Sequence, residues 1–147
     1  MTYFDFNDGN GPVPAHQHSN GNGWVADTAE VADTAYVGTD AVVYGNAKVF
    51  GYAKVYGNAR VSDNAEVYGN AEVSDNAEVY GNAKVFGYAM VYENAHVYDH
   101  AMVYENVEVS GYVEIFGMTV ITGEARVFGD GLVSGNARVS DDEEEVE

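Results

Sequence analysis

A branched aliphatic residue occupies every sixth position from Val25 to Val139, twenty positions in all, counting Ile115 and Ile121. The repeat is based on Ala-x-Val-x-Gly-Asn, and Ala47-Lys48-Val49-Phe50-Gly51 shows its first five positions. The alternation of Ala and Val with polar residues predicts short β-strands whose Ala and Val side chains face inward. A short fixed period of this kind is typical of a stacked solenoid.

Many repeats end in Gly-Asn or Asp-Asn, and such pairs predict a sharp corner after each strand. These residue types tolerate a left-handed backbone or bond their own main chain. Three six-residue sides with three corners would form one coil of 18 residues. The segment at 44–56 recurs at 80–92, a shift of 36 residues, which supports a two-coil unit independently. Twenty repeats therefore predict between six and seven coils.

Residues 25–140, with this aliphatic and small-residue pattern, resemble the left-handed parallel β-helix of the hexapeptide-repeat superfamily. The resemblance implies an all-β fold, a single-stranded left-handed parallel β-helix with a triangular outline, and a homotrimer of parallel columns. The GNAKV and GNARV repeats, preceded by DFNDGNGPVPAHQH, resemble small hexapeptide-repeat proteins of tailed phages and some bacteria.

Two segments flank the predicted β-helix. Residues 1–24 contain both prolines and are predicted to cap the first coil with the aromatic side chains of Tyr3, Phe4, Phe6 and Trp24. Residues 141–147 form an acidic tail that is predicted to be disordered, because its like charges repel one another.

Charge and composition exclude several kinds of partner. The 147 residues carry a formal charge of −18 with only six Lys plus Arg, which disfavours direct binding to nucleic acid or anionic lipid. The absence of cysteine excludes disulfides and thiolate metal sites. We find no apolar run of membrane-spanning length and no secretory signal features. We therefore expect no membrane association. We expect the protein either in the cytoplasm of the cell that produces it, such as a phage-infected cell, or in a virion.

Outward residues of successive coils fall into columns, and one column is the most apolar. It contains Phe50, Tyr68, Phe86 and Tyr104; beside it Lys48, Glu66 and Lys84 alternate in sign before Met102 and Val120. Contiguous exposed apolar surface often marks an interface. Six residues are therefore the predicted self-association interface: Phe50, Tyr68, Phe86, Met102, Tyr104 and Val120. The alternative is that the aromatic ladder only stabilises the fold.

Histidines provide the candidate chemistry. His16 and His18 have the spacing of a transition-metal chelate, and their His-x-His resembles the metal-binding motif of trimeric phage tail fibres, where the segments meet on the trimer axis. Polar loop residues are the alternative. The superfamily resemblance makes His96 and His100 candidates for the general base of an acyltransferase. However, the chain lacks the external loop and C-terminal helix that usually complete such an active site.

The sequence therefore favours a non-enzymatic, rigid, self-associating β-helix that acts as a structural or protein-interaction component and needs no cofactor. Two alternatives remain open. One is a protein that sequesters a small molecule in grooves between subunits, where tyrosines stack on a ring. The other is an acyltransferase-like enzyme.

Overall fold

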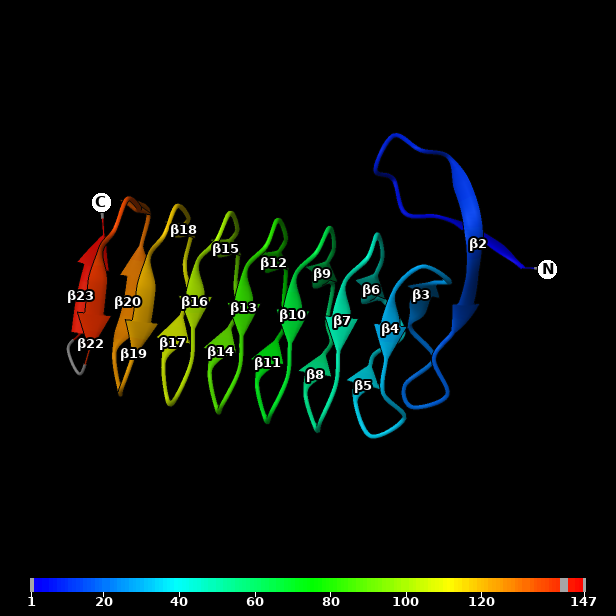
Figure 1. Cartoon of the computed structure of the whole chain (residues 1–147), viewed down its shortest axis with the longest axis horizontal. Coiled ribbons are helices and arrows are strands. Elements are labelled where there is room, and N and C mark those ends of the chain that lie inside the picture. The colour runs from blue at the N-terminus through cyan, green and yellow to red at the C-terminus, as the bar shows by residue number, and fades with distance from the viewer. Residues whose placement is uncertain (1, 141–142, 147) are drawn as a thin grey trace.

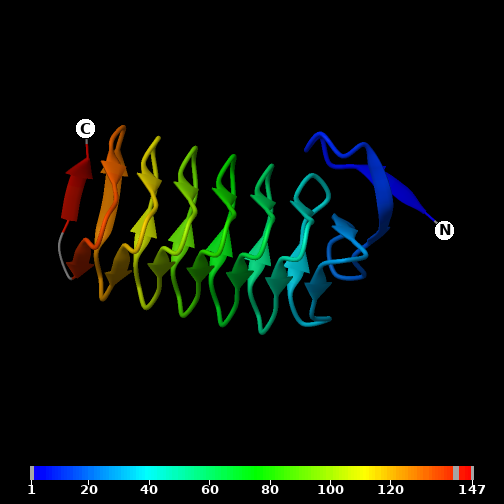
Figure 2. The ribbon, with the colours of Figure 1, turned by 45° about the horizontal axis from the view of Figure 1, so that its top comes forward.

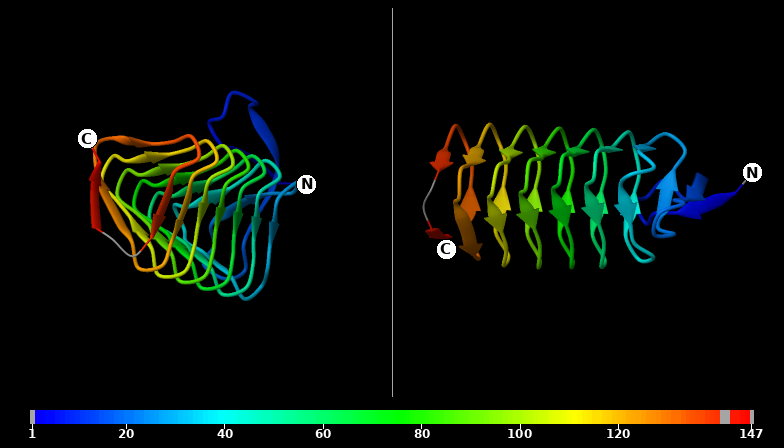
Figure 3. Two further views of the ribbon diagram at one scale, coloured as in Figure 1. Left: turned by 60° about the vertical axis from the view of Figure 1, so that its left-hand side comes forward. Right: turned by 90° about the horizontal axis from the view of Figure 1, so that it is seen from below.

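Each six-residue repeat contributes one short strand because only the residue pair ending in the inward Val is extended before the next corner begins. The computed structural model describes residues 2–140 and 143–146, and all of its regular elements are strands. They form three sheets around one axis, with the coils stacked behind one another (Figures 1 and 3). The part of the chain described here contains no helix long and apolar enough to cross a membrane.

The strands follow one another from the first sheet to the second and third, and then return to the first one coil later. The first sheet contains β1 (Tyr3–Asp5), β2 (Pro12–Gln17), β3 (Trp24–Ala26), β6 (Val42–Val43), β9 (Arg60–Val61), β12 (Glu78–Val79), β15 (His96–Val97), β18 (Glu114–Ile115) and β21 (Leu132–Val133). The second contains β4 (Glu30–Val31), β7 (Lys48–Val49), β10 (Glu66–Val67), β13 (Lys84–Val85), β16 (Met102–Val103), β19 (Val120–Thr122) and β22 (Arg138–Ser140). The third contains β5 (Tyr36–Val37), β8 (Lys54–Val55), β11 (Glu72–Val73), β14 (Met90–Val91), β17 (Glu108–Val109), β20 (Arg126–Gly129) and β23 (Glu143–Val146).

Parallel pairing in strict register sets the 18-residue coil. Val67, for example, pairs with Val49 in the coil before it and with Val85 in the coil after it. The inward Ala and Val side chains stack into one continuous core, and most of them have no exposed surface. The structure thus confirms the predicted all-β solenoid, with about six turns spaced about 18 residues apart.

Near the C-terminal end, larger residues replace the small Ala inside the coil. Val107, Val113 and Thr119 are all fully buried. The Thr119 hydroxyl donates to the Phe116 carbonyl at 2.8 Å, so its polar group has a partner inside the coil. The stack therefore continues across these replacements.

Acidic residues at several corners have a structural role. Asp63 has a left-handed backbone, with φ of 57°, and its Oδ2 accepts a hydrogen bond from the Gly81 amide one coil later at 3.0 Å. Asp75 and Asp99 repeat this arrangement, with φ of 56° and 58° and contacts of 3.1 Å to the amides of Glu93 and Gly117. These carboxylates therefore tie each corner to the next coil.

The N-terminal segment forms a hairpin that lengthens the first sheet beyond the first coil. Strands β1 and β2 pair antiparallel, and β2 pairs antiparallel with β3 (Figure 2). Phe4 stacks on Trp24 with ring centroids 4.7 Å apart, and Phe6 stacks on Tyr44 at 5.0 Å. Tyr3 is 57% exposed, so the predicted aromatic cluster forms without it and includes Tyr44 instead.

Arg60 fastens this hairpin to the coils. Its Nη2 donates to the Phe6 carbonyl at 2.6 Å and to the Tyr44 hydroxyl at 2.8 Å. Its guanidinium also lies over the Tyr44 ring, 5.1 Å from the centroid. A charged residue 54 positions away thus holds the cap in place.

The C-terminal segment differs from the prediction. The sequence predicted a disordered tail over 141–147, yet Glu143–Val146 form β23, which pairs in parallel with β20. Residues 141, 142 and 147 lie outside the described part. Strand pairing uses backbone groups whatever the side chains are, and the last coil offers an unpaired edge. The Val146 side chain also packs against the core, and its carbonyl oxygen accepts hydrogen bonds from the amides of Asp130 and Gly131, both at 2.7 Å.

Replacing Phe6 with Ala should release the hairpin. The ring is 1% exposed, and truncation of a buried Phe costs about 3–5 kcal/mol. Since solenoid coils contact only their neighbours, the loss should stay local. We expect faster limited proteolysis near the N-terminus while amide exchange in β12–β18 stays slow. The exposed Tyr3→Ala is the matched control; equal cleavage of wild type and Phe6→Ala would contradict the anchoring role of Phe6.

Candidate functional site

An uninterrupted stack of aromatic rings runs along the outside of the second sheet. Phe50, Tyr68, Phe86 and Tyr104 each follow the inward Val of their strand. Successive centroids are 4.6, 4.7 and 4.7 Å apart, and the planes lie within 3° of parallel. The strand spacing of about 4.8 Å imposes this geometry, because register places equivalent side chains directly above one another.

The other predicted interface residues lie in the column next to these rings. Strand register aligns Lys48, Glu66, Lys84, Met102 and Val120 in that order. Phe50 is 38% exposed, whereas the other three rings, Met102 and Val120 are partly buried. The structure therefore places all six predicted interface residues on one face of the solenoid.

Sequence reasoning missed two tyrosines at the edge of this face. Tyr52 and Tyr88 directly follow the corner glycines after Phe50 and Phe86, and they are 67% and 65% exposed. The signal was present in the sequence, because GYA replaces GNA at these two corners. A corner Asn only completes a turn, whereas a corner Tyr adds an exposed ring to the surface.

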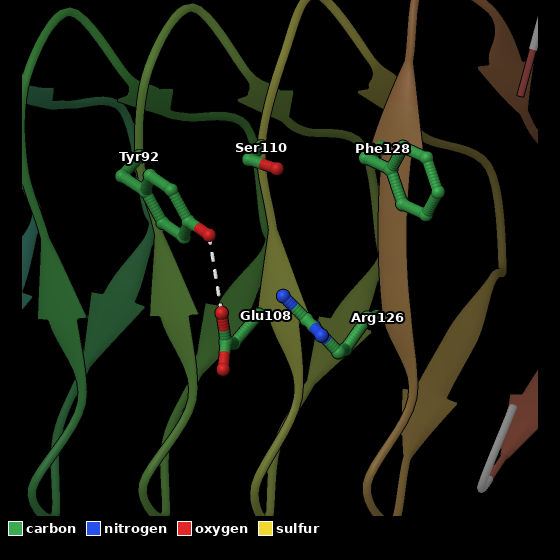
Figure 4. Close-up of a pocket in the computed structure, with 5 residues that line it drawn as sticks. All are labelled: Tyr92, Glu108, Ser110, Arg126 and Phe128. Atoms are coloured by element: carbon green, nitrogen blue, oxygen red, sulfur yellow. Dashed lines mark hydrogen bonds between the residues drawn. The ribbon is translucent and has the colours of Figure 1, made fainter. Parts of the chain in front are cut away.

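The third sheet has a different column, in which rings alternate with serines. Tyr56, Ser74, Tyr92, Ser110 and Phe128 follow one another in successive coils. A pocket of about 180 Å³ lies above Ser110. Figure 4 shows Tyr92 and Phe128 on either side of Ser110, with Glu108 and Arg126 from the neighbouring column. The Tyr92 hydroxyl donates to Glu108 Oε1 at 3.1 Å.

Burial changes the pKa of several outward tyrosines. It raises the pKa of five of them above the ordinary value of 10.0, because the phenolate loses hydration: Tyr56, Tyr68, Tyr80, Tyr92 and Tyr98. In Tyr98 a second cause adds to the rise in pKa, since its neutral hydroxyl donates to Glu114 Oε1 at 2.8 Å. These phenols therefore stay protonated where the unfolded chain would ionise.

The two histidines predicted to bind a metal contact different partners. His16 Nδ1 lies 2.7 Å from Asp27 Oδ1, at a half-exposed position. His18 is 4% exposed and its Nε2 donates to the Ala35 carbonyl at 2.8 Å. Across residues 2–140 and 143–146 no group of three or more His, Cys, Asp or Glu side chains could hold a metal ion.

The two candidate catalytic histidines occupy different parts of a coil. His96 lies on the outer face of β15, where its Nε2 is 3.8 Å from Glu78 Oε2 and its ring meets the Tyr80 ring edge-on at 6.0 Å. His100 is exposed at the following corner. The Glu78 carboxylate thus lies close to His96, at a separation longer than a hydrogen bond.

Comparison with known proteins supports the repeat architecture. Residues 53–69 match the family model described as the YdcK beta solenoid repeat. No curated protein and no solved structure matches the chain. The match covers about one coil, so it identifies the type of repeat that the chain contains.

The tyrosine pKa shifts predict how stability changes in alkaline solution. Because the unfolded chain loses phenol protons near pH 10 and the folded chain holds them, the contribution of these tyrosines to the free energy of unfolding should be constant below about pH 10 and fall as pH rises above it. Urea denaturation across this range measures the effect. Tyr98→Phe should be less stable than wild type at neutral pH by about 1 kcal/mol, from the lost hydrogen bond to Glu114.

Above pH 10 the gap between Tyr98→Phe and wild type should narrow, since the variant has no phenol at this position to ionise. If the free energies of unfolding of the two proteins changed with pH in parallel, a raised pKa of Tyr98 in the folded state would be contradicted.

Proposed function

We propose that this chain is a non-enzymatic, rigid β-solenoid that acts through protein–protein contact, and that copies of it associate through the aromatic face of the second sheet as a homotrimer. The observation that carries the proposal is the unbroken stack of four parallel rings, 4.6–4.7 Å apart. The exposed Tyr52 and Tyr88 border this stack. Aromatic residues are enriched in protein interfaces, and a contiguous apolar patch favours burial against a partner.

Rigidity supports the same proposal. Every inner coil is hydrogen-bonded to the coils on both sides, so the rings keep fixed positions on the surface. A preorganised face loses little conformational entropy when it binds. The resemblance of the GNA(K/R)V repeats to small phage proteins extends the proposal to a component of a virion or of an infected cell.

A small-molecule-binding protein is the second candidate. The pocket above Ser110 favours it, because Tyr92 and Phe128 offer ring faces and Glu108 and Arg126 offer both charges. The strong net negative charge disfavours phosphorylated ligands. The acyltransferase alternative depends on His96 and its contact with Glu78, and turnover of an acyl donor that is lost in His96→Ala would support it.

Two double variants test the proposed interface. Serine is the natural small residue at the outward position, as at Ser62 and Ser74, so Tyr68→Ser/Phe86→Ser should fold. We expect wild type to be a trimer in native mass spectrometry and sedimentation velocity, and this variant to associate at least tenfold more weakly. Tyr80→Ser/Tyr98→Ser is the matched control, because it removes two stacked rings from the first sheet, outside the proposed interface. This control variant should remain a trimer.

Wild type that stays monomeric at all concentrations would overturn the self-association proposal, as would equal weakening by both double variants. The same native spectra would detect a retained small molecule or a metal on the trimer axis, and so test the alternatives.

A further inference from the structure

The third sheet contains gaps of the right size for one aromatic ring. Stacked rings in adjacent coils of the other sheets are 4.6–5.1 Å apart. Tyr92 and Phe128 belong to coils two layers apart, so about 9.6 Å separates their positions, which is room for one ring between them. The pocket above Ser110 occupies this space. Ser74 has the same setting between Tyr56 and Tyr92, 36 residues earlier.

The protein extends one outward column with a ring from another segment of its own chain. On the first sheet, Ala26 is the small residue of the outward column that continues to Tyr44. Phe6 packs in a cluster with Ala26 and stacks on Tyr44 at 5.0 Å with an interplanar angle of 16°. The inserted ring is 1% exposed. A column can therefore accept a ring that another segment supplies.

The exposed corner tyrosines have the spacing of the gaps. Tyr52 and Tyr88 are 36 residues apart, and so are Ser74 and Ser110. Both separations equal two coils, because one coil contains 18 residues. Any alignment of two parallel columns that places one tyrosine in a gap therefore places the second tyrosine in the other gap.

Charges repeat with the same spacing and with opposite sign. Lys48 and Lys84 each lie four residues before a corner tyrosine, whereas Glu72 and Glu108 each lie two residues before a gap serine. The hydroxyls of Tyr56 and Tyr92 bond Glu72 and Glu108 at 2.8 and 3.1 Å and so hold both carboxylates at the gaps.

Two lysines near two carboxylates would offset part of the repulsion between copies that each carry a charge of −18. At Ser110, Arg126 and Glu108 both line the pocket, so an incoming hydroxyl would lie beside a guanidinium and a carboxylate.

We propose that a second copy of this chain occupies the gaps, with its Tyr52 and Tyr88 inserted above Ser74 and Ser110. This inference rests on the proposed self-association and names the surface that receives the aromatic face. The contact joins two different surfaces, the edge of the second sheet on one copy and the third sheet on the next. Contacts of this head-to-tail kind close into a ring only when the rotation between copies involves no shift along the symmetry axis. Ser74 and Ser110 lie one coil beyond Tyr52 and Tyr88, so a closed trimer requires the columns to tilt against the trimer axis.

Filling the gaps from within tests the inference. Ser74→Tyr/Ser110→Tyr extends the column with the ring that this repeat already carries elsewhere, so the variant should fold with unchanged or higher resistance to urea. We expect its self-association to weaken at least tenfold in sedimentation velocity. Ser134→Tyr is the matched control, because it adds a ring after Phe116 on the first sheet and leaves the gaps open; its association should equal that of wild type.

Removing the inserted rings is the second test. Tyr52→Ala/Tyr88→Ala should also weaken association at least tenfold, whereas Tyr112→Ala, a 64% exposed tyrosine at a different corner, should leave it unchanged. A self-associating wild type whose affinity survives both double variants would overturn this inference and leave the second-sheet interface standing. A monomeric wild type would overturn both.

Discussion

Strict register between parallel strands is the constraint on which the rest of this structure depends. Because paired residues of the strands from β3 to β22 lie 18 positions apart, a choice made at one position of the repeat is repeated along the axis. Inward, this stacks Val on Val and Ala on Ala in a core of which most side chains have no exposed surface. Outward, the same register stacks rings on rings and charges on charges. One backbone rule therefore produces both the core and the surface columns.

The outward columns serve stability and surface chemistry together. Stacked rings shield one another, which raises the pKa of Tyr68 and Tyr80 and adds cross-strand packing. The same rings still present an edge to solvent. A single small residue in such a column interrupts the stack of rings. At Ser110 the interruption forms a pocket, and beside Ala26 it leaves space in which Phe6 packs. Small differences within a regular repeat are therefore where this protein acquires specific surfaces.

The ends of the solenoid are completed by segments that do not follow the repeat. At the N-terminal end, the hairpin pairs with the first sheet, and Arg60 ties it down through the Phe6 carbonyl. At the other end, β23 pairs with β20 despite its acidic sequence. Both cover strand edges that would otherwise be free to pair with other chains. The hairpin covers the first sheet beside β3, and β23 covers the third sheet beside β20, while β4, β21 and β22 remain edge strands.

The sequence by itself determined the all-β solenoid, the 18-residue coil and the membership of each outward column. All three follow from the six-residue period of its aliphatic residues. The stack that begins at Phe50 could be predicted for the same reason. Only the tertiary structure decided how the segments outside the repeat behave. Phe6 finds Tyr44, Arg60 finds the hairpin, His18 becomes buried against Ala35, and Glu143–Val146 form a strand. These contacts join residues with no periodic relation, and they depend on which backbone edges and ring faces the completed coils leave unpaired.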